Sequence, residues 1–244
     1  MNINFEKKRI LVTGTGQGIG RELALRLSKY KGEVFALSKT QKNLDSLVAA
    51  DPKIHPVCVD LRDWDATRKA VQNILPIDLL VNNAGVGYLT SFLDSTPEEF
   101  DLTFDVNVKA VLNVSQIVAK NMIERKSGGS IVNLSSQAGE VALRDHTIYC
   151  ASKGALNLMF KTMALELGPH NIRVNAVGPT VVMTELGKKG WSDPQKAQNM
   201  LKQIPLGRFA EVDEVVDAVV FLLSDRSSMI SGVNLLVDGG FVAC

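Results

Sequence analysis

Tyr149 and Lys153 lie four residues apart in the stretch TIYCASKGALNLMFKTMALEL, residues 147–167. Its apolar residues recur at three- and four-residue spacing, which predicts a helix with one buried face. Residues at this separation share a side of a helix, so the phenol and the ammonium group can meet one substrate. A nearby ammonium group lowers a phenol pKa from about 10 and allows proton exchange near neutral pH. Two half-exposed polar residues on an amphipathic helix are the alternative interpretation of this pair alone.

A serine stands where it can join this pair. Ser130–Leu134 is predicted to be a strand, and Ser136 follows its carboxyl end. From there it can face Tyr149 and donate to a substrate oxygen, although serines at strand ends are also common turn residues. Ser136 lies outside a GxSxG motif, which argues against Ser-His-Asp hydrolysis. His146 is the histidine nearest in sequence; it can contact substrate or be a solvated loop residue.

A glycine-rich turn, TGTGQGIG at residues 13–20, follows the predicted strand Ile10–Thr13 and leads directly into a helical pattern. Glycine lets the backbone approach a pyrophosphate, and the helix N-terminal dipole favours its charge. The turn therefore predicts a dinucleotide site; a tight turn without a ligand is the alternative. Its expected binding residues are Gly14, Gly18, Ile19 and Gly20.

The end of the second predicted strand, Val34–Ser38, indicates which dinucleotide is bound. An NAD-binding protein usually carries an acid here for the adenine ribose, whereas this chain reads Ser38, Lys39, Thr40. A cation and two hydroxyls favour a ribose 2′-phosphate, so the expected cofactor is NADP(H). The alternative is that Lys39 is a solvated loop residue.

Two more strand ends are expected to border the cofactor. Val57–Asp60 is the third predicted strand, with Asp60 as an acceptor for the adenine amino group and Leu61 beside it. Leu79–Asn82 is the fourth. Asn82 is expected to have a structural role because a buried amide needs partners. The residues expected to line the cleft are Asn83, Ala84 and Gly85.

The order of these elements predicts the fold class. Short apolar runs alternate with helical patterns, and the last two predicted strands are Arg173–Val177 and Asn234–Val237. Continuous apolar runs predict strands covered on both faces, hence a doubly wound (Rossmann) α/β fold with a mostly parallel seven-stranded sheet. Residues 1–244 show no linker or repeat and are expected to form one domain. The only long irregular stretch is expected at residues 178–193.

Two long helices are expected at residues 97–124 and 147–167. Asn107 interrupts the apolar pattern of the first, and a mid-helix asparagine usually has a local role. Both helices carry apolar residues on more than one side, which suits either a subunit contact or the core.

Composition and charge limit the classes of molecule that this chain is expected to bind. The chain has 45% hydrophobic residues and a formal net charge of +1, with no block of like charge. Neither a nucleic-acid surface nor a basic membrane helix is indicated. The N-terminus lacks a signal-peptide pattern and no apolar run is long enough for a membrane span, so a cytoplasmic protein is expected. Cys58, Cys150 and Cys244 are scattered, which favours reduced thiols and no metal site.

Taken together, these motifs resemble the short-chain dehydrogenase/reductase family over nearly the whole chain. The resemblance rests on TGTGQGIG, NNAG at 82–85, Asn107, Ser136, YCASK at 149–153 and the segment 179–184. PTVVMT, WSDP, IPLGRFAEV and the C-terminal GGFVAC resemble a narrower subgroup of the family. That resemblance implies an NADPH-linked homotetramer that reduces pentuloses such as L-xylulose and small α-dicarbonyls.

The family resemblance implies a role for each catalytic residue. Tyr149 would protonate the carbonyl oxygen, Lys153 would lower the phenol pKa and hold the nicotinamide ribose, and Ser136 would polarise the carbonyl. Asn107 would position a water molecule that joins Lys153 to solvent. Residues implied to hold the nicotinamide are Pro179, Val182 and Thr184, and those implied to contact substrate are Gln137, His146 and Trp191.

One departure and two other functions stay open. Gln17 stands where many NADPH-using relatives carry a basic residue, which leaves Lys39 as the only expected cation. The same scaffold also serves 3-oxoacyl thioester reductases, although no basic surface for an acyl-carrier protein is evident. An NADP(H)-sensing binding protein without chemistry is the third possibility, but it would usually lack one of the four catalytic residues.

Overall fold

The computed structural model describes residues 3–243, apart from the side chains of Leu186 and Lys189. Its strands form one seven-stranded sheet in the order β3-β2-β1-β4-β5-β6-β7. Every neighbouring pair is parallel, so the predicted fold class is confirmed and the sheet is wholly, rather than mostly, parallel. The strands are β1 Arg9–Thr13, β2 Glu33–Ser38, β3 His55–Cys58, β4 Leu79–Asn82, β5 Gly129–Leu134, β6 Ile172–Pro179 and β7 Asn234–Val237.

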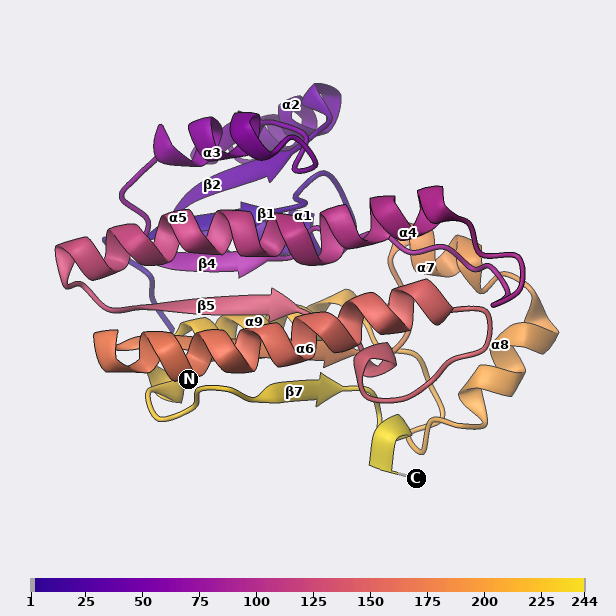
Figure 1. Ribbon diagram of the computed structural model, residues 1–244. Coiled ribbons are helices and arrows are strands. Elements are labelled where there is room, and N and C mark those ends of the chain that lie inside the picture. The colour runs from indigo at the N-terminus through magenta and orange to yellow at the C-terminus, as the bar shows by residue number, and fades with distance from the viewer. Residues whose placement is uncertain (1–2, 244) are drawn as a thin grey trace.

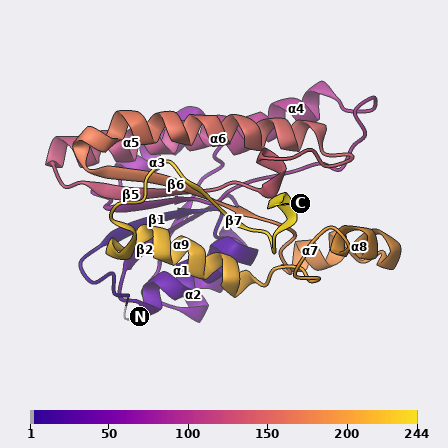
Figure 2. The ribbon, with the colours of Figure 1, turned by 90° about the horizontal axis from the view of Figure 1, so that it is seen from below.

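Helices cover both faces of this sheet. Figures 1 and 2 show α1, α2 and α9 on one face, with α3, α4, α5 and α6 on the other. The short helices α7 and α8 lie beyond the carboxyl ends of the strands. The helices are α1 Gly18–Lys29, α2 Gln41–Ala50, α3 Trp64–Gln72, α4 Pro97–Phe104, α5 Ala110–Arg125, α6 Thr147–Leu167, α7 Glu185–Gly190, α8 Pro194–Leu201 and α9 Val212–Leu223.

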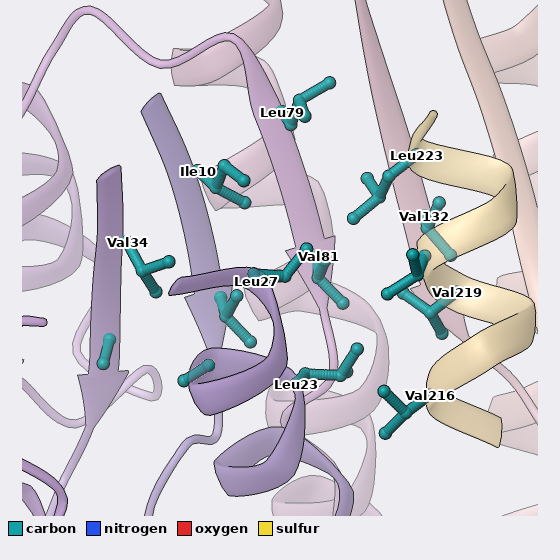
Figure 3. Packing of buried hydrophobic residues seen from close by; sticks show 14 of the residues in the cluster. Ile10, Leu23, Leu27, Val34, Leu79, Val81, Val132, Val216, Val219 and Leu223 are labelled. Carbon is teal, nitrogen blue, oxygen red and sulfur yellow. The ribbon is translucent and has the colours of Figure 1, made fainter. Parts of the chain in front are cut away.

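Each face has its own apolar layer. On one side, Leu23 of α1 and Val219 of α9 pack against strand residues such as Val81, and all three are fully buried (Figure 3). On the other side, Phe160 of α6 lies in a cluster with Leu80 and Ile131. Burying one such side chain contributes about 2 kcal/mol. Because both faces are covered, the central strands read as continuous apolar runs.

The predicted elements differ most from the structure at three places. The third strand ends at Cys58 rather than Asp60, because the chain turns there and the Asp63 amide donates to the Asp60 carbonyl oxygen at 3.0 Å. The predicted helix at 97–124 is α4 and α5 joined by a π-helical segment, Asp105–Lys109. The stretch 178–193 is not wholly irregular: it contains α7, whose first turn is capped by the Thr184 hydroxyl, which accepts from the Gly187 amide at 3.0 Å. A helix as short as α7 leaves little apolar periodicity in the sequence.

Cys58 and Cys150 carry free thiols, as expected, and Cys244 lies outside the described residues. Within residues 3–243, no helix combines the length and apolar character needed to cross a membrane. In the same part of the chain, no group of three or more His, Cys, Asp or Glu side chains is placed to hold a metal ion.

Candidate active site

A cleft of about 740 Å³ lies at the carboxyl ends of the strands and is bordered by segments that follow β1, β2, β3 and β4. Strand order reverses between β1 and β4, and ligands of open α/β sheets bind at such a reversal. The predicted cofactor residues that line it are Gly14, Gly18, Ile19, Gly20, Ser38, Lys39, Thr40, Asp60, Leu61, Asn83, Ala84, Gly85 and Thr184.

The glycine turn is shaped by close backbone packing. Gly14 has a φ of +71°, and a Cβ atom there would lie 2.7 Å from the Ala84 Cα. The Asn83 side chain ties this turn to β4 by donating to the carbonyl oxygens of Thr13 and Gly14, at 2.9 and 3.1 Å. Gln17 makes no side-chain cap on α1, so the first amide groups of that helix remain for an anion. These features fit a bound pyrophosphate.

The β2 and β3 ends carry two cations. Ser38 pairs with Cys58 in parallel register, which puts Lys39 beside the residues that follow β3. Arg62 also lines the cleft, and its Nη2 lies 2.7 Å from an Asp60 carboxylate oxygen. Arg62 is therefore a second cation at this cleft, in addition to the expected Lys39. Sequence reasoning missed Arg62, although a basic residue two positions after the predicted strand end was a usable signal.

That ion pair changes what Asp60 can do. The hydrogen bond from Arg62 holds the pKa of the Asp60 carboxyl below its usual range. Both carboxylate oxygens accept from the guanidinium, at 2.7 to 3.2 Å. Asp60 borders the cleft as predicted, but its acceptor capacity toward an adenine amino group is shared with Arg62.

Helix α6 has the predicted bounds, Thr147–Leu167, and it carries both Tyr149 and Lys153. The Lys153 Nζ lies 5.6 Å from the centre of the Tyr149 ring and donates to the Leu134 carbonyl oxygen at 2.7 Å. Lys153 is 4% exposed, and burial lowers its pKa from 10.5 to about 8. The amine is still mainly protonated at pH 7.

The protonation of Tyr149 differs from the sequence expectation. Burial raises the pKa of its phenol above 10, and a hydrogen bond with Ser136 offsets part of that rise. Loss of hydration outweighs the interactions that lower the pKa of this buried phenol. Tyr149 therefore carries its proton at neutral pH, as a proton donor must.

Asn107 locks the π-helical segment to the rest of the site. Its side chain accepts from the Val86 amide at 2.9 Å, donates to the Val86 carbonyl oxygen at 2.9 Å, and donates to the Ser152 hydroxyl at 3.0 Å. Ser152 in turn donates to the Tyr149 carbonyl oxygen at 2.8 Å. Asn107 thus joins the end of β4 to the turn of α6 that carries Tyr149, which explains a polar residue among apolar ones.

The three predicted substrate residues have different surroundings. Gln137 is 2% exposed, and its Oε1 has no hydrogen-bond partner among the residues that the structure describes. The His146 Nδ1 lies 2.5 Å from the Arg144 carbonyl oxygen, and the imidazole meets the Tyr149 ring edge-on at 6.3 Å. Trp191 instead packs on the Phe209 ring at 5.6 Å, with the Lys196 Nζ over its face at 4.9 Å. The His146 ring thus lies beside the candidate acid, whereas Trp191 is anchored beside α8.

The segment implied to hold the nicotinamide is only partly at the cleft. Pro179 ends β6, and neither it nor Val182 is among the residues that border the cleft. The Thr184 amide donates to the Val182 carbonyl oxygen at 2.7 Å, and a Cβ atom on Gly18 would lie 3.1 Å from the Thr184 methyl carbon. Thr184 therefore closes the cleft over the glycine turn.

Comparison with known proteins agrees with this geometry. A family model described as enoyl-(acyl carrier protein) reductase matches residues 14–242. A solved short-chain dehydrogenase/reductase family protein aligns with a TM-score of 0.93 and 31% identity, covering 99% of this chain and 100% of that one. The chain belongs to the short-chain dehydrogenase/reductase family.

Relatives within this family are similar over their whole length. The chain is 57% identical over 243 residues to the L-xylulose reductase of Mus musculus, covering 100% of both chains. It is 49% identical over 243 residues to carbonyl reductase (NADPH) 2 of Sus scrofa, again covering 100% of both. A solved gluconate 5-dehydrogenase from Burkholderia cenocepacia, in complex with NADP and tartrate, has a TM-score of 0.94 and 29% identity, with coverage of 99% of this chain and 97% of that one. This short-chain dehydrogenase/reductase is thus an oxidoreductase that acts on a C=O or CH–OH group with a nicotinamide cofactor.

Proposed function

We propose that this short-chain dehydrogenase/reductase is an NADPH-dependent reductase of small polar ketones, with L-xylulose and α-dicarbonyls as its substrates. The observation that carries the proposal is the meeting of Tyr149, Lys153 and Ser136 beside a cleft bordered by the glycine turn and Lys39. Similarity to an L-xylulose reductase and to an NADPH-linked carbonyl reductase supports the choice of substrate.

The cofactor would lie along the cleft. Gly14, Gly18 and Gly20 would face the pyrophosphate, and Asn83 to Gly85 would border its nicotinamide half. Ser38 and Thr40 would donate to the 2′-phosphate beside the Lys39 ammonium group. NADP in the complex of the gluconate 5-dehydrogenase supports this preference. The bound nicotinamide supplies the hydride that reduces the carbonyl carbon.

The side chains of the site would handle the proton and the developing charge. The Ser136 hydroxyl would donate to the carbonyl oxygen and stabilise its negative charge. The Tyr149 phenol, which is protonated at neutral pH, would transfer its proton to that oxygen and complete the alcohol. The Lys153 ammonium group would stabilise the phenolate left behind and bind the ribose hydroxyls, while Asn107 would hold the π-helical segment against α6.

The experiment is NADPH oxidation with L-xylulose, diacetyl and an acetoacetyl thioester, together with separate measurements of NADPH affinity. We expect turnover of the first two and a loss of about 10²- to 10⁴-fold in Tyr149→Phe with little change in NADPH affinity. Tyr30→Phe is the matched control, because Tyr30 lies at the far end of α1 and should leave turnover unchanged.

Each other outcome points to another function. Turnover of the thioester alone would favour a 3-oxoacyl thioester reductase, and NADPH binding without any turnover would favour a cofactor sensor. Near-normal turnover by Tyr149→Phe would refute the assignment of the proton donor.

A homotetramer and a cytoplasmic location complete the proposal. Helices α4, α5 and α6 lie on one face of the sheet and carry exposed apolar side chains, which a subunit contact would cover. These exposed side chains are Phe100, Leu112, Leu158 and Leu165. Sedimentation equilibrium should therefore give a mass of about four chains.

A further inference from the structure

Arg62 lies where the adenine ribose of the cofactor would be bound. It follows β3, the neighbour of β2, and it borders the same cleft as Ser38 and Lys39. Adjacent strands are about 4.8 Å apart, so groups that follow β2 and β3 can reach one ligand. The Arg62 side chain is 50% exposed and therefore accessible from the cleft.

Asp60 interacts with two cations. Its carboxylate accepts from the Arg62 Nη2 at 2.7 Å, from the Arg62 Nε at 3.0 Å, and from the Arg62 backbone amide at 3.0 Å. The charge of Lys39 also helps to hold the pKa of the Asp60 carboxyl below its usual range. Lys39, Asp60 and Arg62 thus carry a net charge of +1 together. Removal of the Arg62 side chain would leave Lys39 and Asp60 with no net charge.

The guanidinium keeps donors for a second anion. Arginine has five N–H donors, and Asp60 uses those of Nε and Nη2. Among the residues that the structure describes, none accepts from Nη1. A phosphate monoester carries a charge of about −1.5 to −2 at neutral pH and is matched by the planar donors of arginine. Asp60 would hold the guanidinium in place while its remaining donors reach that phosphate.

We propose that Arg62 is a specificity-determining residue that recognises the 2′-phosphate of NADP(H) together with Lys39. The inference rests on the proposed NADPH preference and explains how this chain supports it with Gln17 in the glycine turn. Without Arg62, the bare Asp60 carboxylate would repel the same phosphate and cancel the charge of Lys39.

The test compares ligands with and without the phosphate. Dissociation constants for NADPH, NADH, 2′,5′-ADP and 5′-AMP are measured with the unaltered protein, Arg62→Ala and Arg62→Lys. Arg62→Ala should weaken NADPH and 2′,5′-ADP about 10-fold or more and leave NADH and 5′-AMP within about twofold, since charge-assisted hydrogen bonds are the strong ones. Arg62→Lys should weaken NADPH and 2′,5′-ADP less than Arg62→Ala does, because lysine keeps the positive charge but lacks the paired N–H donors of arginine.

Lys69→Ala is the control for a general loss of positive charge, because Lys69 lies in the last turn of α3 and does not border the cleft. Equal weakening of all four ligands by Arg62→Ala, or no change in any, would overturn the role of Arg62. The unaltered protein tests the proposed function separately. Equal affinities for NADPH and NADH there would refute the NADPH preference, whereas a preference that Arg62→Ala leaves undiminished refutes only this inference.

Discussion

Replacing Lys153 with Met should change how the free energy of unfolding depends on pH. Lys153 is buried, and its pKa falls from 10.5 in the unfolded chain to about 8 in the fold. Below pH 8 both states hold the proton, and the fold carries the full cost of a buried charge. Between pH 8 and 10.5 only the unfolded state holds it, so this cost disappears as pH rises.

The size of the effect follows from the two pKa values. The gap between 10.5 and about 8, at about 1.36 kcal/mol per pH unit, amounts to about 3 kcal/mol. Lys153→Met removes that cost at every pH but leaves the Leu134 carbonyl oxygen without its donor, a penalty of about 1–3 kcal/mol that does not depend on pH. The stability of the variant relative to the unaltered protein should therefore fall by about 3 kcal/mol between pH 7 and pH 11.

The assay is urea unfolding of cofactor-free protein at a fixed protein concentration, repeated across that pH range. The concentration is fixed because any subunit association would stabilise the fold by mass action. Lys161→Met is the control, since Lys161 is an exposed residue of the same helix and its difference from the unaltered protein should not vary with pH. A flat difference for Lys153→Met would refute the reasoning that Lys153 is buried as a strained charge.

Asn107→Ala and Gly87→Ala test the geometry around Tyr149, with Asn113→Ala and Gly168→Ala as their respective controls. Asn107→Ala and Asn113→Ala both remove buried amides with several hydrogen bonds, so each should lower the free energy of unfolding by about 2–4 kcal/mol in urea titrations. Only Asn107→Ala should also lower kcat, and equal kcat losses would contradict the link from Asn107 to α6. A Cβ atom on Gly87 would lie 2.9 Å from the Tyr149 ring, so Gly87→Ala should reduce kcat about 10-fold or more by displacing the phenol. Gly168→Ala meets nothing within 4 Å and should keep normal kcat; unchanged kcat in both would show that the ring adjusts freely.

Burial shifts the pKa values of Tyr149 and Lys153, the two titratable groups of the site on α6, in opposite directions. Loss of hydration disfavours the phenolate of Tyr149 and the ammonium form of Lys153 alike. The phenol therefore keeps its proton, whereas the amine titrates within reach of physiological pH. A pair of groups tuned in this way can deliver a proton and then stabilise the anion that remains.

Local patterns in the sequence determined much of this protein. The bounds of α6, β4 and β7 matched their predictions because apolar periodicity follows directly from which faces are buried. The glycine turn was recognisable since its spacing is imposed by backbone conformation, as the φ of +71° at Gly14 shows. Asn82 was expected to be structural, and its amide donates to Ser115 and Asn133, both at 2.9 Å.

Tertiary structure alone decided the features that depend on contacts between distant segments. The π-helical segment around Asn107 forms where Val86 and Ser152 take up its side chain, and no local pattern encodes that meeting. The direction of the Tyr149 pKa depends on burial, which a spacing of four residues cannot report. The pairing of Arg62 with Asp60 beside Lys39 needs β3 to lie next to β2. Sequence spacing fixes which residues share a helix or strand, whereas the dielectric and the partners of each charge arise only when the chain is packed.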